Sequence, residues 1–255
     1  MADDKYQLNQ LAIRHSSRFP GRPTIVFLHD SLGSIELWRD FPEKLCTATG
    51  CNALIYDRHG YGKSGPLIHT PRESNYMEVE ADILAEIILE YKLSQVVLFG
   101  HSDGGTIALL AAAKHPELVA AVITEGAHIF VENETLQGIR QAIDQYKSTG
   151  LKSKLEKYHG TNTDEMFNAW AQTWTADFFR NWNIEKFLPL VTCPTLVIQG
   201  EQDEFGTTKQ VSGIANGISG KAETFLVPNA KHTPHKETGQ VVIEKCADFI
   251  KAIFG

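Results

Sequence analysis

Short runs of apolar, often β-branched residues alternate along the chain with longer segments in which apolar side chains recur every three or four positions. The first pattern predicts buried strands and the second predicts amphipathic helices. The predicted strands are residues 24–28, 52–56, 95–99, 119–124, 195–199 and 222–227. The predicted helices include residues 36–47, 77–91 and 241–254. This alternation predicts an α/β fold with a mainly parallel sheet that carries helices on both faces.

The alternation stops between about residue 129 and residue 182, where a helical pattern continues without a strand. The sequence therefore predicts a core of residues 1–127 and 186–255, with a helical cap formed by residues 128–185. Within the cap, Phe167, Trp170, Trp174 and Phe178 recur at spacings of three, four and four, which predicts one aromatic stripe on a helix. Such stripes usually pack in a core, and this one can also roof an apolar pocket. Trp170 and Trp174 are therefore candidate substrate-binding residues.

Length and composition indicate a soluble globular protein of 255 residues, which fits one α/β domain with an insertion. The net charge of -7 and the lack of a block rich in Lys or Arg argue against a nucleic-acid partner. No apolar run approaches the ~20 residues of a membrane span. Residues 1–5 are polar and acidic, unlike a signal peptide, and the four cysteines show no ligand-like spacing. We expect a cytoplasmic monomer or small homo-oligomer that acts on a small molecule and contains no metal.

The segment Gly100-His101-Ser102-Asp103-Gly104 has the pattern G-x-S-x-G. A predicted strand precedes it directly, and a strong helix former, Thr106 to Ala113, follows it. A serine on a sharp turn from a strand to a helix has the geometry of a nucleophile elbow. The glycines permit the tight backbone, and the helix N-terminus favours developing negative charge. A chance match in a loop would lack this setting, so Ser102 is the candidate nucleophile.

A serine hydroxyl is a weak nucleophile that needs a base, and the base needs an acid to orient it. Asp203 follows the strand of residues 195–199, and His232 follows the strand of residues 222–227. Both therefore fall at carboxyl ends of strands, at the same edge of the sheet as Ser102. The alternatives that remain open are Glu125, Glu201 and Glu204 as the acid and His235 as the base.

Several segments, in order, resemble the α/β-hydrolase superfamily. Phe27-Leu28-His29-Asp30-Ser31 is similar to its strand followed by a His-Gly pair, and residues 57–64 are similar to its D-x-R-G-x-G-x-S stretch. The resemblance covers nearly the whole chain outside the cap. It implies the α/β-hydrolase fold, with a mostly parallel sheet of the eight-stranded type, and a triad of Ser102, Asp203 and His232 without any cofactor. It also makes residues 60–64 a structural turn rather than a phosphate loop, which would need a glycine where Asp57 stands.

The same resemblance implies an oxyanion hole formed by the backbone N–H groups of Ser31 and Asp103. The chain departs from the family at Asp30, because the family usually has a glycine there. A side chain at this position can constrain the loop or approach the substrate. Asp30 is therefore a candidate substrate-binding residue.

Asp103 is an unusual neighbour for a nucleophile. The helix macrodipole favours a carboxylate in the first turn of a helix, and this is a sufficient structural explanation. A negative charge beside Ser102 would nevertheless repel a developing oxyanion, unless the carboxylate turns away or is paired with a cation. The run Ser102-Asp103-Gly104-Gly105 resembles the valacyclovir-hydrolase (biphenyl-hydrolase-like) branch of the superfamily, whose members cleave α-amino-acid esters. Asp103 is therefore also a candidate site for a substrate cation.

The sequence thus predicts a serine hydrolase that cleaves small carboxylic esters through an acyl-enzyme, with α-amino-acid esters as one option. Two alternatives use the same residues. The first is a carbon–carbon bond hydrolase or a perhydrolase, because the fold alone does not select the chemistry. The second is a ligand sensor that keeps the triad and turns over slowly.

Overall fold

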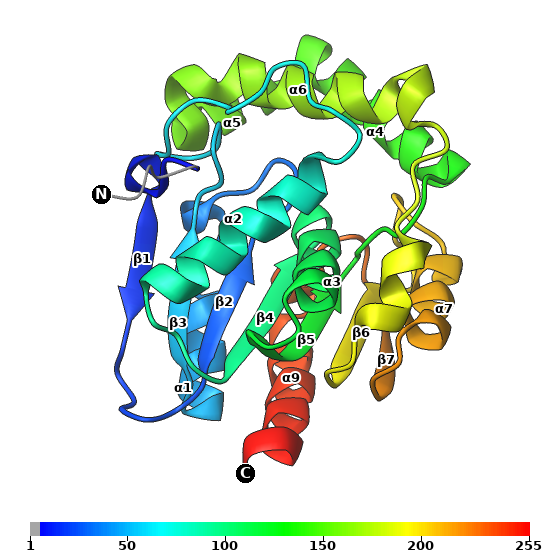
Figure 1. The fold of residues 1–255 in the computed structure, drawn as a ribbon. Helices are drawn as coiled ribbons and strands as arrows, with labels where there is room; N and C mark the ends of the chain where they lie inside the picture. The colour runs from blue at the N-terminus through cyan, green and yellow to red at the C-terminus, as the bar shows by residue number, and fades with distance from the viewer. Residues whose placement is uncertain (1–5) are drawn as a thin grey trace.

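The computed structural model describes residues 6–255, so the expectation drawn from residues 1–5 lies outside the described residues. A sheet of seven strands forms its centre, in the order β1-β3-β2-β4-β5-β6-β7 (Figure 1). β1 pairs antiparallel with β3, and all other neighbours in the sheet pair in parallel. The strands are Ile13–Ser16 (β1), Thr24–Leu28 (β2), Asn52–Tyr56 (β3), Val96–His101 (β4), Val119–Glu125 (β5), Thr195–Gly200 (β6) and Ala222–Val227 (β7).

The predicted α/β fold class is confirmed, and the described residues form seven strands where the eight-stranded type was predicted. All six strands predicted from apolar runs are present, with ends that differ by at most two residues. The pattern missed β1, an edge strand of four residues with two exposed positions, Arg14 and His15. An edge strand that is exposed to solvent carries no continuous apolar run, so periodicity does not reveal it.

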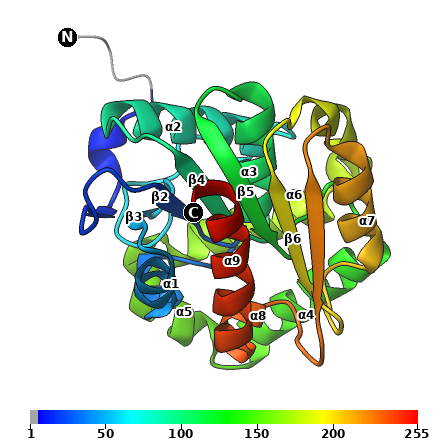
Figure 2. The same ribbon diagram turned by 90° about the horizontal axis from the view of Figure 1, so that it is seen from below.

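Helices cover both faces of the sheet, as Figures 1 and 2 show. α1 (Phe41–Thr49) and α9 (Gly239–Phe254) lie on one face, and α2 (Tyr76–Glu90), α3 (Asp103–Lys114) and α7 (Thr208–Gly217) lie on the other. Alternate side chains of β2 enter the two cores: Ile25 and Phe27 pack in the core beneath α1 and α9, and Val26 and Leu28 pack beneath α2 and α3. A strand buried on both faces has a continuous apolar sequence, which explains why these strands were easy to predict.

The helix predicted over residues 36–47 is divided in two. Ile35–Trp38 forms a 3-10 turn (η2), and α1 begins only at Phe41, with Pro42 in its first turn. Arg39 lies between them with a φ of 54°, a left-handed conformation that no helix can include. The apolar spacing of Leu37, Phe41 and Leu45 therefore did not reveal the break.

The segment that lacks strands forms a layer of helices over the carboxyl ends of the parallel strands (Figure 1). It contains α4 (Asn133–Ser148), α5 (Leu151–His159) and α6 (Thr163–Thr175), with 3-10 turns at Gly160–Asn162 (η3) and Asp177–Phe179 (η4). A further 3-10 turn, Glu185–Leu190 (η5), leads from this segment back to β6. Phe167, Trp170 and Trp174 of α6 are buried, whereas Phe178 lies beyond the helix and is 58% exposed. The aromatic stripe therefore ends at Trp174, and its predicted continuation to Phe178 is wrong.

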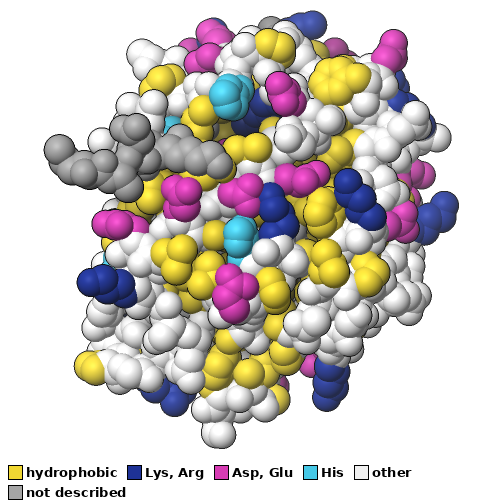
Figure 3. Space-filling model, in the orientation of Figure 1, with side chains coloured by type: hydrophobic (Ala, Val, Ile, Leu, Met, Phe, Trp, Pro, Cys, Tyr) yellow, Lys and Arg dark blue, Asp and Glu magenta, His cyan; other side chains and the backbone are white. Residues whose placement is uncertain are grey.

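The described surface mixes its charges. On the face shown in Figure 3, acidic and basic side chains are interspersed among apolar ones over the described residues. Between residues 6 and 255, no helix is both long and apolar enough to cross a membrane.

Candidate active site

Ser102 occupies the turn between β4 and α3, with a φ of 54° and a ψ of -120°. Non-glycine residues rarely adopt this conformation, which costs about 1–3 kcal/mol and is found mainly at functional sites. The flanking glycines permit this conformation because the backbone of neighbouring segments packs directly against their Cα atoms. A Cβ on Gly100 would lie 2.1 Å from the carbonyl oxygen of Gly104, and a Cβ on Gly104 would lie 2.1 Å from the carbonyl oxygen of Leu28. The pattern G-x-S-x-G is therefore a steric requirement of this turn.

The loop that follows β2 is held by His29 and Arg58. Burial lowers the pKa of His29 well below its ordinary value, so the ring is neutral at pH 7. Its Nε2 accepts a hydrogen bond from the backbone N–H of Arg58 at 3.1 Å, and its Nδ1–H donates to the carbonyl oxygen of Asp30 at 2.7 Å. Arg58 Nη2 donates to the same carbonyl at 2.9 Å. These bonds fix the backbone directly before Ser31, one of the two predicted oxyanion donors.

The stretch of residues 57–64 is a structural turn. The carboxylate of Asp57 accepts hydrogen bonds from the backbone N–H groups of Ile35, at 2.6 Å, and Lys63, at 2.9 Å. Ser64 Oγ donates to the carbonyl oxygen of Asp57 at 2.5 Å. The side chains of Asp57 and Ser64 thus both form hydrogen bonds within the protein, as expected for a structural turn.

Asp203 and His232 meet across the ends of β6 and β7. His232 Nδ1 lies 2.8 Å from Asp203 Oδ1 and 2.9 Å from Oδ2, so that Nδ1–H donates to the carboxylate. Burial alone lowers the pKa of His232, but the charge of Asp203 and its hydrogen bond raise it above the ordinary value. Burial likewise raises the pKa of Asp203, but His232 holds it below its ordinary value. With Nδ1 committed to Asp203, Nε2 is the nitrogen that can accept a proton.

A cavity of about 250 Å³ lies between the sheet and the helical layer. Ser102 and His232 line it together, and Ile139 of α4 contributes an apolar wall from the opposite side. Asp203 stands behind His232 as its hydrogen-bond partner. The other predicted site residues that line the cavity are Asp30, Ser31, Asp103, Trp170 and Trp174.

The carboxylate of Asp103 is engaged within the protein. Its Oδ2 accepts a hydrogen bond from the hydroxyl of Tyr76 at 2.9 Å, and that hydroxyl accepts one from Trp174 Nε1 at 3.0 Å. Asp103 also interacts electrostatically with the buried guanidinium groups of Arg58 and Arg72. Internal groups therefore offset part of the negative charge that stands next to Ser102.

Sequence reasoning missed Tyr76 and His128. Tyr76 begins α2, one residue before the predicted start of this helix, and its place in the sequence gives no sign of a contact 27 positions away. His128 lines the cavity, and burial lowers its pKa below the ordinary value. Its Nε2–H donates to the carbonyl oxygen of Phe205 at 3.0 Å, and its ring centre lies 5.9 Å from that of His232. No pattern in the sequence around His128 indicated a role for this ring.

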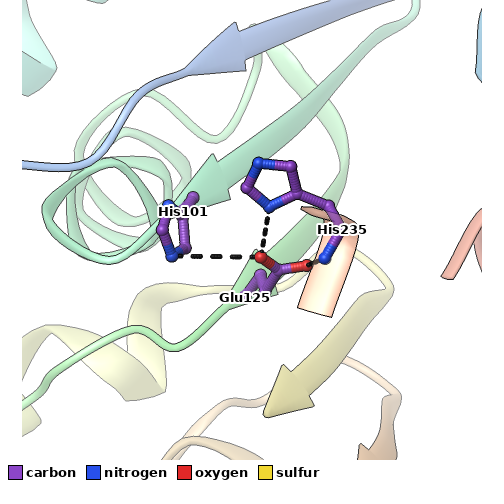
Figure 4. A group of neighbouring side chains, drawn as sticks. All are labelled: His101, Glu125 and His235. Carbon is purple, nitrogen blue, oxygen red and sulfur yellow. Dashed lines mark hydrogen bonds and ion pairs between the residues drawn. The ribbon is translucent and has the colours of Figure 1, made fainter. Parts of the chain in front are cut away.

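The alternative acids lie in other environments. Figure 4 shows that Glu125 is directed at His235: its Oε1 lies 2.5 Å from His235 Nδ1. Glu204 accepts a hydrogen bond from the backbone N–H of His232 at 3.2 Å, and Glu201 is exposed. The carboxylate that accepts the Nδ1–H of the His232 ring is therefore that of Asp203.

The Gly126→Ala variant is expected to lower kcat by about 100-fold, because a displacement of ~1 Å at a reacting group can have that effect. A Cβ on Gly126 would lie 2.9 Å from His232 Cε1 and 3.4 Å from Asp203 Oδ2. The φ of 59° adds a cost of about 1–2 kcal/mol in stability. Steady-state kinetics and thermal unfolding measure the two effects. A variant of reduced stability with unchanged kcat would show that His232 tolerates the displacement.

The chain is similar to known proteins in both sequence and fold. A family model described as the alpha/beta hydrolase fold matches residues 23–149. A curated relative from Mus musculus, named Serine hydrolase BPHL, is 26% identical over 256 residues, which cover 97% of this chain and 86% of the relative.

Two solved structures show the same fold. MGS-M2, an alpha/beta hydrolase enzyme from a Medee basin deep-sea metagenome library, aligns with a TM-score of 0.76 at 16% identity and covers 94% of each chain. A thermophilic esterase from Thermogutta terrifontis aligns with a TM-score of 0.68 at 19% identity, over 95% of this chain and 93% of its own. At this level of identity the two alignments establish the fold alone.

Proposed function

Since this chain belongs to the α/β-hydrolase fold superfamily and is a serine hydrolase, we propose that it cleaves small carboxylic esters through an acyl-enzyme on Ser102. The observation that carries the proposal is the hydrogen bond between Asp203 and His232 Nδ1 beside a cavity that Ser102 also lines. A base with an orienting carboxylate next to a serine on a strained turn is the arrangement that activates a hydroxyl nucleophile.

In the proposed reaction, His232 Nε2 accepts the proton of the Ser102 hydroxyl while Oγ attacks the carbonyl carbon of the ester. The backbone N–H groups of Ser31 and Asp103 stabilise the oxyanion of the tetrahedral intermediate. The imidazolium then donates its proton to the departing alkoxide, and the acyl group remains on Ser102. A water molecule, deprotonated by His232, attacks the acyl-enzyme and releases the carboxylic acid. Asp203 keeps its charge throughout and stabilises the imidazolium.

The charged groups on the cavity wall favour a cationic substrate. Asp30, Asp103 and Glu204 contribute carboxylates, against one ammonium group, that of Lys236. Burial alone raises the pKa of Asp30, but its interaction with His101 holds that pKa well below the ordinary value, so Asp30 is ionised at pH 7. Excess negative charge in a narrow cavity attracts a cation and opposes an anionic acyl group. α-Amino-acid esters meet this requirement with a small acyl group.

The Asp103→Asn variant tests this substrate class. We expect kcat/KM for a valyl ester to fall by about tenfold or more, because the variant removes a carboxylate near the substrate ammonium group. The 3-methylbutanoyl ester of the same alcohol has the same shape without the amine, and its kcat/KM is expected to change by less than about twofold. Equal losses on the two esters would contradict recognition of the amine by Asp103.

A panel of p-nitrophenyl esters tests the hydrolase proposal itself. We expect many turnovers per active site and covalent labelling by a fluorophosphonate. Labelling accompanied by a single turnover would favour the ligand sensor. Turnover of a β-diketone, or of hydrogen peroxide with a carboxylic acid, in place of the esters would favour the carbon–carbon bond hydrolase or the perhydrolase.

A further inference from the structure

A second group of titratable side chains lies beneath the predicted triad. His101, Glu125 and His235 are 5% exposed or less, and they come from the end of β4, the end of β5 and the short helix α8 (Pro234–Glu237) (Figure 4). Glu125 Oε1 lies 2.5 Å from His235 Nδ1, and Oε2 accepts a hydrogen bond from the backbone N–H of His235 at 3.0 Å. His101 Nε2 lies 3.9 Å from Glu125 Oε1. The proposed reaction uses none of these three side chains.

These residues connect the loop of the nucleophile to the loop of the base. The backbone carbonyl of Glu125 accepts a hydrogen bond from the N–H of Ser102 at 2.8 Å, and its carboxyl group holds His235. His101 Nε2–H donates to the backbone carbonyl of His232 at 2.8 Å. Residues 232 and 235 of one loop are thus both attached to the segment around Ser102. This placement limits how far the imidazole of His232 can move relative to Ser102.

The protonation states of Glu125 and His235 allow a hydrogen bond between the two side chains without a buried ion pair. Burial raises the pKa of Glu125 to about 7 and lowers the pKa of His235 to about 3, so His235 is neutral at pH 7. In the protonated state, the Glu125 hydroxyl at Oε1 donates to His235 Nδ1 while Oε2 accepts from the His235 N–H. A glutamine can form the same two bonds, because its amide group offers one N–H donor and one carbonyl acceptor in the same positions.

The surroundings keep water away from this pair. The rings of Trp38 and Phe41 lie 4.8 Å and 5.2 Å from the ring of His235, and Cys246 of α9 is buried near Glu125. The other charged groups that interact with the pair are Asp30, His232, Lys236 and Glu237. A hydrogen bond in such an apolar setting is stronger than one in water, and the loss of one partner is costly.

We propose that Glu125 is a positioning residue for the base of the reaction: through its hydrogen bonds to His235, and alongside the bond from His101 to His232, it holds the loop of His232 against the loop of Ser102. This inference rests on the proposed function, because it assigns His232 as the base. The site then has three groups that fix its geometry: Asp203 orients the ring of His232, His29 and Arg58 hold the loop before Ser31, and Glu125 holds the loop of His232. Glu125 itself touches neither the substrate nor the reacting atoms.

A metal ion is the competing explanation for this group of residues. One ligand atom from each of the three side chains lies within 4.8 Å of the others. The hydrogen bond from His101 Nε2–H to the carbonyl of His232 places a proton on the nitrogen that would have to bind the metal. The positioning role needs no change in this geometry. Metal binding by His101 Nε2 would require its hydrogen bond to the carbonyl of His232 to break.

The test compares Glu125→Ala, Glu125→Gln and His235→Ala in ester hydrolysis. We expect Glu125→Ala to lower kcat by about tenfold to 100-fold with KM changed less than about twofold, because misplacement of a base affects the chemical step. Glu125→Gln is expected to retain kcat, because it keeps both hydrogen bonds. The double variant Glu125→Ala/His235→Ala should be no slower than either single variant, since both remove the same interaction.

Two controls separate positioning from general loss of stability. Ile88→Ala creates a cavity in buried α2, in the core on the other face of the sheet from Trp38 and Phe41, and is expected to lower the unfolding temperature while leaving kcat unchanged. Hydrogen exchange of residues 230–238 should increase in Glu125→Ala at pH 7 and remain slow in Glu125→Gln. This exchange measurement does not depend on activity, so it tests the placement of the loop even if esters prove not to be substrates.

Three results would overturn the proposal: an unchanged kcat in Glu125→Ala, a loss of kcat in Glu125→Gln equal to that in Glu125→Ala, or a loss confined to KM. One equivalent of a tightly bound transition metal in the purified wild-type protein, absent from Glu125→Ala, would assign the group to metal binding instead. If the wild-type protein hydrolyses esters and the variants show these results, positioning fails while the hydrolase proposal stands.

Discussion

Replacement of Ser102 by alanine is expected to lower kcat for ester hydrolysis by about 10⁶-fold, the loss found when the nucleophile of a serine triad is removed. Ser102 is the residue held at a φ of 54° between β4 and α3, beside His232 on the cavity wall. The fluorophosphonate label should disappear in the same variant.

The alanine variant should fold normally, because alanine is smaller than serine and meets the same backbone constraint. Circular dichroism and thermal unfolding check this. Ser212→Ala, on the exposed surface of α7, is the matched control and is expected to keep the wild-type kcat within about twofold, as most exposed substitutions do. Residual turnover near the wild-type rate in Ser102→Ala would assign the nucleophile to another residue.

Asp203→Asn is expected to lower kcat by about 10⁴-fold, because an amide permits the imidazole to adopt the wrong tautomer and does not stabilise its cation. In the wild-type protein, Asp203 is the carboxylate that accepts the Nδ1–H of His232. An asparagine side chain keeps the size of the residue and removes the charge. Glu201→Gln, at an exposed position two residues away, is the control and should leave kcat unchanged.

The pH dependence of kcat/KM tests the effect of Asp203 on His232 independently of the size of kcat. His232 acts as a base in its neutral form, so activity is lost as pH falls through the pKa of His232. Asp203 raises that pKa above the ordinary value of 6.5, against the effect of burial, so the acidic limb of the wild-type profile should lie above pH 6.5. In Asp203→Asn burial dominates, and the limb should move to lower pH. A limb that moves to higher pH would contradict this role of Asp203.

The local parts of this account were visible in the sequence. The parallel strands are buried on both faces, so their apolar runs marked them directly, and the strand ends then located Asp203 and His232. The elbow was recognisable because its glycines and its serine fall within five residues, and because each glycine meets a steric requirement of the turn. The edge strand β1 and the break at Arg39 leave no such pattern.

Contacts between distant segments were beyond a single sequence. The bond between Tyr76 and Asp103 joins residues 27 positions apart, and the pair of Glu125 and His235 spans 110 positions. Glu125 was considered as an acid for His232, and only the geometry shows that its partner is His235. Which side chains meet is decided by packing in three dimensions, which the apolar periodicity does not encode.

The central claim, an acyl-enzyme on Ser102, can be tested directly by acid quench during the first turnovers of a p-nitrophenyl ester, followed by mass spectrometry of peptides. The account predicts a burst of p-nitrophenol and an added acyl mass on the peptide that contains Ser102, with no addition in Ser102→Ala. Turnover of the ester with no acyl mass on Ser102, or with the mass on another residue, would contradict it.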